Sequence, residues 1–238
     1  MSKTTIVKKN LKNSTYLTLK EKLINCIYPP GTILNEIQLA EDFGLSRTPV
    51  REAISRLEMD GYVKVMPKKG IYVTDISLND VHQIFQTRIE IEPIALKLAA
   101  PYLETDELIM FRNRFEHDTP DIINAFRLDT AMHLFIIEHC GNRYIIDMMR
   151  KLFDDNTRIV IASKQNQVRI HNAKCEHLEI LDSLIVREDL EKTAALMGTH
   201  LETCRRAALD YFYSLEYSHS IPEKAQYIQE LSKLSQQS

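Results

Sequence analysis

The sequence predicts a mainly α-helical fold, in which an N-terminal winged helix-turn-helix of three helices and a β-hairpin wing is followed by an all-helical bundle. Three observations lead to this prediction. Apolar residues recur at helical spacing through most of the chain. Strand-like alternation is confined to residues 62–73, and Gly and Pro become rare beyond Ser77. We therefore expect a winged domain at residues 1–75, a helical domain at 76–216 and a C-terminal tail at 217–238.

The first two helices are each marked by an apolar stripe and a stop signal. Apolar residues have helical spacing between positions 16 and 27, and this pattern ends at Pro29-Pro30-Gly31. Asn35 can cap the next helix, with Gln38 as its capping-box partner three residues later. Gly44 ends this second helix.

The third helix begins almost at once. Only Leu45 separates Gly44 from Ser46, which is the N-cap candidate of the third helix. From Val50 onward, apolar residues repeat at the i, i+4, i+7 spacing of a buried helix face. Two helices joined by so tight a turn form a helix-turn-helix.

A short hairpin and a series of helices follow. Residues 62–66 and 71–73 flank the basic tip Pro67-Lys68-Lys69-Gly70, which predicts a small β-hairpin. Beyond Ser77, periodic apolar stretches predict helices at 78–100, 105–117, 121–139, 143–162, 168–186 and 189–213.

Charge is divided unevenly along the chain. The whole protein carries a formal net charge of −3. Residues 1–75 contain 12 Lys and Arg against 8 Asp and Glu, whereas the remaining residues contain 18 against 25. This asymmetry indicates that the first third alone meets a polyanion.

Composition also argues against several classes of protein. The four cysteines are scattered without a CxxC pair, which disfavours a zinc ribbon, a thioredoxin-type site and a disulfide framework. No apolar run approaches the roughly 18 residues needed to cross a bilayer, and the polar segment 1–10 lacks a secretory apolar stretch. We expect a cytoplasmic protein with no membrane partner.

The start of the third helix is the candidate DNA-reading face. Arg47 and Arg51 are four residues apart, so both point outward, opposite the apolar stripe. An Arg fork matches the O6 and N7 acceptors of guanine in the major groove. Candidates for further contacts with phosphates or the neighbouring minor groove are Ser46, Thr48, Lys68, Lys69 and Gly70. Charge alone would favour a solvated face and a hairpin used in protein contact, but the helix-turn-helix spacing together with the basic tip favours DNA.

A second group of polar residues lies in the helical part. Asp129 and His133 are four residues apart, so a carboxylate and an imidazole share one helical face and can share a cation. His177 and His200 fall on later helices among apolar residues, and inward ligands from facing helices are how bundles build metal sites. Spacing alone leaves the alternative that these are hydrogen-bonded core histidines.

The helix-turn-helix region carries a dense pattern, made up of Pro30-Gly31, Leu34-Asn35-Glu36, Leu39-Ala40, the run from Phe43 to Ala53, Leu57 and Gly61. This pattern resembles the winged helix-turn-helix of the GntR family of bacterial transcription regulators. The resemblance implies that Arg47 and Arg51 read guanines in a short palindrome and that Gly70 of the wing approaches the minor groove. Ile37 departs from the pattern, because some members of the family have a basic DNA contact early in the second helix.

The helical part carries a looser pattern, made up of Arg88 to Glu92, Ala95, Ala99-Ala100, Asp129 to His133, Gly141-Asn142 and the stretch from His177 to His200. It is similar to the FCD ligand-binding domain found in the FadR subfamily. The resemblance implies that one Asp and three His hold a divalent ion at the bottom of an effector pocket. The matching positions are Asp129, His133, His177 and His200. His171 is the alternative ligand if His177 is not one.

Such a site suits Zn²⁺, Ni²⁺ or Mn²⁺, with water or an organic acid completing the coordination shell. Arg88 could hold a ligand carboxylate through a bidentate pair, and Asn142 could add a polar contact. The alternative for Arg88 is a salt bridge with Glu90, Glu92 or another helix.

The sequence therefore predicts a transcription regulator and not an enzyme. A homodimer would bind a palindromic operator, because one short recognition helix reads too few base pairs, and a small carboxylic acid at the metal would modulate that binding. One alternative is a hydrolytic metalloenzyme that uses the same Asp and His residues, since an open metal position can activate water. The other is a regulator whose effector is the metal ion or a larger acyl ligand.

Overall fold

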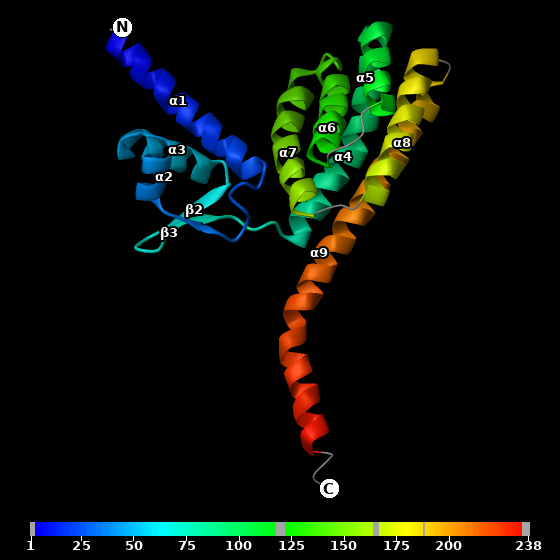
Figure 1. Ribbon diagram of the computed structural model, residues 1–238. Helices are drawn as coiled ribbons and strands as arrows, with labels where there is room; N and C mark the ends of the chain where they lie inside the picture. Colours follow the sequence, from blue (N-terminus) through cyan, green and yellow to red (C-terminus); the bar gives the residue numbers. More distant parts are fainter. Residues whose placement is uncertain (1–2, 118–121, 164–166, 188, 235–238) are drawn as a thin grey trace. The chain divides into compact units, whose positions relative to one another are not determined.

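The computed structural model describes the backbone of residues 3–117, 122–163, 167–187 and 189–234 (Figure 1). It confirms the predicted class, with a small winged region followed by helices. The chain divides into two compact units, one of Met1–Ile76 with Arg150–Ala162 and the other of Ser77–Met149 with Ser163–Ser238. The division between Ile76 and Ser77 lies one residue from the predicted domain boundary, whereas the division between Met149 and Arg150 falls within a single helix, and the sequence pattern gives no sign of it.

The first unit contains the three predicted helices, α1 (Lys3–Ile24), α2 (Glu36–Asp42) and α3 (Arg47–Met59), although α1 begins well before the predicted stretch 16–27. Asn35 caps α2 as expected, since its side-chain oxygen accepts hydrogen bonds from two backbone N–H groups of the first turn. The expected capping-box role of Gln38 is wrong. Its side-chain amide donates instead to Asp42 at 2.9 Å, one turn further along the same helix face.

The three helices enclose a small apolar core. One face of α1 and one face of α3 pack against each other, and α2 packs against α3. The core consists of Tyr16, Leu19, Leu23, Leu39, Ala40, Val50, Ala53, Ile54, Leu57, Tyr62, Val63, Ile71 and Val73. Because α3 buries the stripe that contains Val50, Ile54 and Leu57, its other face is left at the surface.

The wing belongs to a three-stranded antiparallel sheet. Strands β2 (Val63–Met66) and β3 (Gly70–Val73) form the predicted hairpin, and β1 (Ile33–Leu34) pairs with the other edge of β3. The sequence did not predict β1, because two residues are too few to show alternation. Gly70 has a φ of +121°, and a Cβ there would lie 2.7 Å from the carbonyl oxygen of Leu34. Close packing against β1 is therefore a structural reason for this glycine.

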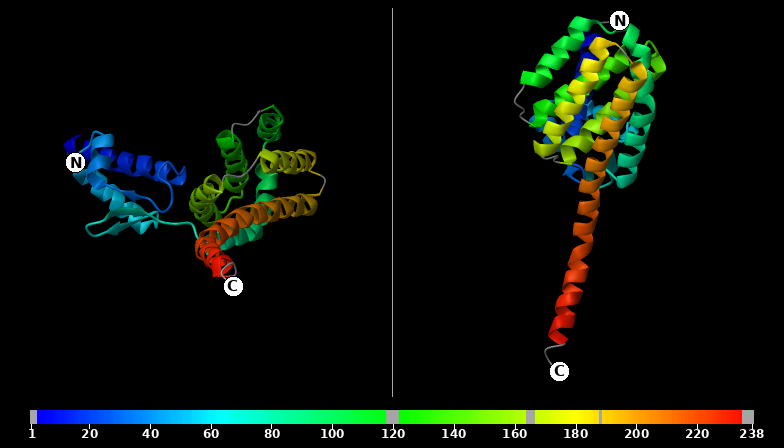
Figure 2. Two further views of the ribbon diagram at one scale, coloured as in Figure 1. Left: turned by 60° about the horizontal axis from the view of Figure 1, so that its bottom comes forward. Right: turned by 90° about the vertical axis from the view of Figure 1, so that its right-hand side faces the viewer.

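The second unit contains helices and their connecting loops, with no strand among its described residues. It comprises α4 (Leu78–Ala99), a 3₁₀ turn (Ala100–Tyr102), α5 (Thr105–His117), α6 (Ile122–Glu138), the beginning of α7 (Arg143–Ala162) as far as Met149, α8 (Gln167–Val186) and α9 (Leu190–Leu234). These bounds agree with the predicted helices except for α9, which continues past residue 213. The right-hand view in Figure 2 shows the last part of α9 extending beyond the other helices of this unit.

Neighbouring helices of the second unit pack in pairs. Helix α4 packs along α9, α5 packs along α8, and α6 contacts both α4 and α8. Buried apolar side chains such as Phe85, Leu96, Met132, Leu181 and Leu201 fill the space between them. This arrangement lets side chains from α4, α6, α8 and α9 meet in one interior region. Among the described helices, none combines the length and the apolar character that crossing a membrane requires.

Candidate functional site

The predicted DNA-reading arginines lie together at the start of α3. The side chains of Arg47 and Arg51 are 55% and 61% exposed, as expected from the burial of the opposite face. Each Nε–H donates to the same oxygen of Glu36, at 2.9 and 2.8 Å. Burial tends to raise the pKa of Glu36, but the hydrogen bonds from Arg51 and Arg47 reverse this and lower it. Glu36 therefore joins the two arginines into one ionic group.

The remaining DNA-contact candidates are also at the surface. Ser46 occupies the N-cap position of α3, but its hydroxyl makes no capping hydrogen bond among the described residues, so the N-terminal amides of α3 are not capped by it. Thr48 is exposed on the first turn. At the wing tip, Lys68 and Lys69 are exposed, and Lys68 has a φ of +63°.

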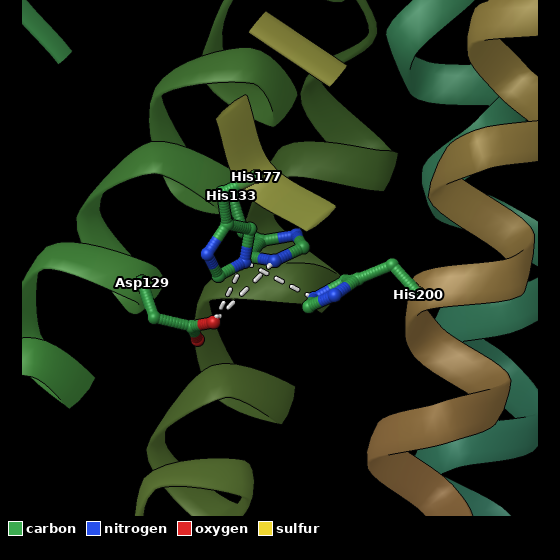
Figure 3. Close-up of side chains that lie close together, drawn as sticks. All are labelled: Asp129, His133, His177 and His200. Atoms are coloured by element: carbon green, nitrogen blue, oxygen red, sulfur yellow. Dashed lines mark hydrogen bonds and ion pairs between the residues drawn. The ribbon is translucent and has the colours of Figure 1, made fainter. Parts of the chain in front are cut away.

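Four predicted metal ligands converge inside the second unit. Asp129 and His133 come from α6, His177 comes from α8 and His200 comes from α9 (Figure 3). One ligand atom from each lies within 4.8 Å of the others. The four residues that spacing and resemblance predicted as ligands thus lie close enough together to share one ion. The side chain of the alternative residue His171 lies outside the part of the chain whose side chains the structure describes.

The distances between these atoms fit a single ion. His177 Nε2 lies 3.0 Å from Asp129 Oδ1 and 3.1 Å from His200 Nε2, and His133 Nε2 lies 3.8 Å from Asp129 Oδ1. Four tetrahedral ligands at roughly 2.1 Å from a zinc ion are about 3.4 Å apart, which lies between these values. Three imidazoles and a carboxylate are also a donor set that suits Zn²⁺, Ni²⁺ and Mn²⁺.

Burial and mutual contact shift the acidities within this cluster. Burial raises the pKa of Asp129, but the hydrogen bond from His177 and the neighbouring imidazoles outweigh it and lower that pKa. Burial, reinforced by the charge of His200, lowers the pKa of His177 to about 4. Burial acts in the same direction on His200, yet Cys204 and Glu176 beside it raise the pKa of this imidazole. The cluster therefore combines an ionised carboxylate with imidazoles held close together, an arrangement that a cation would stabilise.

Two glutamates that the sequence did not connect with the metal site contact the other nitrogens of two of these histidines. Glu92 of α4 lies 2.5 Å from Nδ1 of His133, and Glu176 of α8 lies 2.7 Å from Nδ1 of His200. Burial opposes the ionisation of Glu92, but Arg88 and His133 outweigh it and lower its pKa to about 2. A signal for Glu92 was present in the sequence, since it lies four residues after Arg88. For Glu176, its position beside His177 was the only hint.

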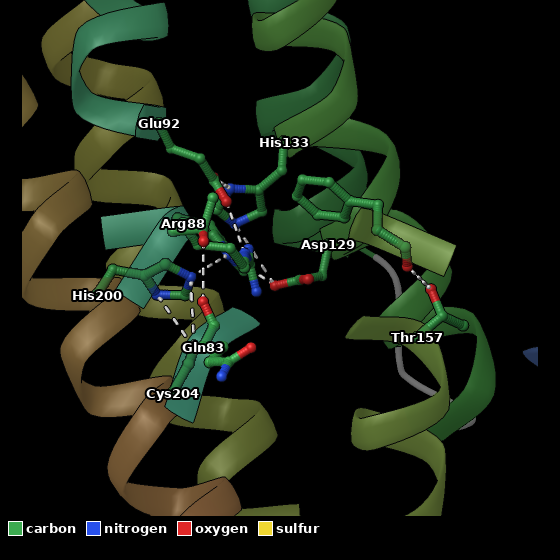
Figure 4. Close-up of polar contacts among 11 residues, drawn as sticks. Gln83, Arg88, Glu92, Asp129, His133, Thr157, His200 and Cys204 are labelled. Atoms are coloured by element: carbon green, nitrogen blue, oxygen red, sulfur yellow. Dashed lines mark hydrogen bonds and ion pairs between the residues drawn. The ribbon is translucent and has the colours of Figure 1, made fainter. Parts of the chain in front are cut away.

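The two predicted effector contacts have other partners in the structure. Arg88 is 2% exposed, and its Nε–H donates to Glu92 at 2.6 Å, which is one of the salt bridges considered as an alternative (Figure 4). Asn142 is exposed, and its side-chain oxygen accepts hydrogen bonds from the backbone N–H groups of Tyr144 and Ile145 at the start of α7. Contact of either residue with an effector stays a prediction. In the structure, the side chain of Asn142 caps the N-terminus of α7.

Comparison with known proteins gives matches to both parts of the chain. Residues 11–73 match the description "Bacterial regulatory proteins, gntR family", and residues 83–203 match the FCD domain. The HTH-type transcriptional regulator YdhC of Bacillus subtilis is 30% identical over 145 residues, which are 58% of this chain and 65% of that protein, just under two thirds of its length. The HTH-type transcriptional repressor RspR of Escherichia coli is 25% identical over 79% of this chain and 84% of its own.

A solved structure supports the fold. A transcriptional regulator of the GntR type from Rhodococcus superposes with a TM-score of 0.71 at 18% identity, covering 84% of this chain and 97% of its own. The gntR family model and both relatives are described as transcription regulators, which agrees with the predicted regulator. The chain belongs to the GntR family of bacterial transcription regulators and carries an FCD domain.

Proposed function

We propose that this regulator binds a palindromic operator as a homodimer and that a small carboxylic acid, bound at a divalent ion in the FCD domain, modulates the binding. The observation that carries the effector part is the convergence of Asp129, His133, His177 and His200 within 4.8 Å. When bound, a Zn²⁺, Ni²⁺ or Mn²⁺ ion would offer a Lewis-acidic position for a carboxylate oxygen. A protein that binds bacterial operator DNA is expected in the cytoplasm.

The arrangement around Glu36 supports the DNA-binding part. Arg47 and Arg51 each donate Nε–H to this carboxylate, which leaves the terminal nitrogens of both guanidiniums for base edges. Holding two long side chains before contact reduces the entropy lost on binding. The exposed hydroxyls of Ser46 and Thr48 and the wing lysines Lys68 and Lys69 are suited to phosphates, with Gly70 in the wing close to the minor groove.

The homodimer has support from the DNA geometry and from the surface of α4. A single recognition helix covers one half-site, so a palindrome requires two copies. Ile94 and Leu98, one turn apart on α4, are 49% and 44% exposed, and Tyr102 continues the same direction at 63%. A second copy of the chain would cover such an apolar row.

Replacing the recognition arginines is expected to reduce both affinity and sequence preference. Arg47→Ala or Arg51→Ala should weaken binding to the cognate operator by about 1–3 kcal/mol and relax specificity, because each removes a fork that matches guanine. Lys68→Ala should weaken binding to all sequences alike, because a phosphate contact carries no sequence information. The operator is first obtained by selection from genomic fragments. Gel shifts with this operator and with a scrambled version of it then measure both effects. Lys192→Ala, which removes one exposed charge from α9, is the control.

If both arginine variants bind the operator as tightly as the wild type, the assigned recognition face is wrong. If Lys192→Ala weakens binding as much as they do, the effect is one of net charge and not of base recognition.

Effector binding is expected to change operator affinity by a coupling free energy of about 1–3 kcal/mol, with the operator changing effector affinity equally. A melting screen of small organic acids, with and without a chelator, would identify candidates that need the ion. Operator titrations with and without the best acid then measure the coupling. An acid that binds without altering operator affinity would contradict the proposed modulation. Binding that survives complete metal removal would place the effector away from the ion.

A further inference from the structure

The metal cluster is surrounded by a second set of charged contacts, which differ among its three histidines. Nδ1 of His133 meets Glu92, and Nδ1 of His200 meets Glu176. Nδ1 of His177 is buried without a hydrogen-bond partner within the described part of the chain. Two of the three imidazoles are thus held by a carboxylate on the side away from the cluster.

The geometry of these contacts determines which ring nitrogen of each imidazole faces the metal cluster. When Nδ1–H donates to a carboxylate, the lone pair of the neutral ring is on Nε2. Nε2 is the atom of His200 that lies 3.1 Å from His177, and Nε2 of His133 lies 3.8 Å from Asp129. The two glutamates therefore point the metal-binding nitrogens of His133 and His200 inward.

Neither glutamate lies on the helix that carries the histidine it contacts. Glu92 lies on α4, 41 residues away from His133 on α6. Its second oxygen accepts from Arg88 at 2.6 Å, which fixes the carboxylate itself, and Figure 4 shows Glu92 between Arg88 and His133. Glu176 is on α8 next to His177, and it reaches His200 on α9. Both glutamates thus connect helices around the cluster.

We infer that Glu92 and Glu176 are positioning residues for the metal centre, which set its affinity by orienting His133 and His200. This inference rests on the proposed metal site. Carboxylates behind metal-bound imidazoles typically change metal affinity by 10–100-fold when they are removed. A purely structural role would alter stability without altering how the ion is held.

The test compares Glu92→Gln and Glu176→Gln with two matched controls. Glu90 and Glu179 are exposed carboxylates on the same two helices, so Glu90→Gln and Glu179→Gln remove the same charge without touching a histidine. Zn²⁺ affinity is measured by competition with a chelator of known affinity. We expect a loss of about 10–100-fold for each positioning variant, a larger loss for the corresponding Ala variants, which lack an acceptor oxygen, and wild-type affinity for both controls.

A spectroscopic readout separates positioning from folding. With Co²⁺ as the probe, the visible ligand-field spectrum reports the geometry of the coordinating atoms and is expected to change in Glu176→Gln, whose partly exposed side chain makes loss of folding a small risk. Unchanged Zn²⁺ affinity and Co²⁺ spectrum in both Gln variants would overturn the inference while leaving the metal site in place. Failure of the wild type to bind either ion would instead overturn the proposed metal site on which the inference rests.

Discussion

Replacing His133 and His177 together with Ala is expected to remove the divalent ion from the protein. Wild-type protein should contain about one ion per chain after purification, and the double variant should contain close to none, because only two of the four donors remain. The ion binds the folded state and not the unfolded one, so it stabilises the fold. The melting temperature of the wild type should therefore fall on chelation, and that of the variant should not. Elemental analysis and thermal melting with and without chelator measure these effects.

A matched control is available on the same unit. His82 is an exposed histidine of α4, so His82→Ala removes an imidazole from the surface and should keep full metal content. Full occupancy in the double variant would move the site elsewhere. An equal drop of melting temperature on chelation in wild type and double variant would show that the chelator acts on something other than this cluster.

The helices and their spacing could be predicted because the determinants are local. The apolar stripe of α3 directly forces Arg47 and Arg51 to the surface, and Asn35 caps α2 as its chemistry requires. The Asp129–His133 pair also follows from a separation of one helical turn. In each case the relevant partner lies within a few residues, so periodicity and capping rules are sufficient.

The contacts that sequence reasoning missed are between distant residues. Glu36 is 11 and 15 residues from the arginines it joins, and Glu92 is 41 residues from His133. Charged residues at such positions look like solvated surface groups, because only the packing of helices brings them to their partners. The pairing of β1 with β3 and the restriction on Gly70 depend on the same long-range packing.

Arg88→Ala is expected to destabilise the second unit by about 3–5 kcal/mol, which is the usual cost of breaking a buried ion pair by removing one partner. Arg88 and Glu92 are each 2% exposed and are joined at 2.6 Å. Without the guanidinium, the Glu92 carboxylate remains buried beside His133 with its main compensating charge lost. Thermal or urea unfolding of wild type and variant measures the difference, and Lys97→Ala, which removes a half-exposed cation from the same helix, is the control.

The loss should depend on pH in a defined direction. In the folded wild type the pKa of Glu92 is lowered to about 2, below the ordinary value of roughly 4.3 for an unfolded chain. This carboxylate therefore stabilises the fold above pH 4.3 or so, and its contribution disappears as the pH falls toward 2. The difference in unfolding free energy between wild type and Arg88→Ala should shrink over the same interval. A difference that stays constant with pH would show that Arg88 contributes packing and not charge.

The same pair decides how the proposed effector role of Arg88 can be tested. A single Arg88→Ala variant confounds loss of effector contact with loss of stability, because it also leaves Glu92 uncompensated. Arg88→Met combined with Glu92→Gln removes both charges while keeping similar volumes, and replacing a buried ion pair by groups of similar size is often close to neutral for stability. We expect this double variant to regain most of the stability lost in Arg88→Ala. If it also regains wild-type coupling between organic acid and operator, the role of Arg88 is limited to its ion pair with Glu92, which in turn contacts His133. If stability returns and coupling does not, while Glu92→Gln alone retains coupling, Arg88 holds the effector carboxylate.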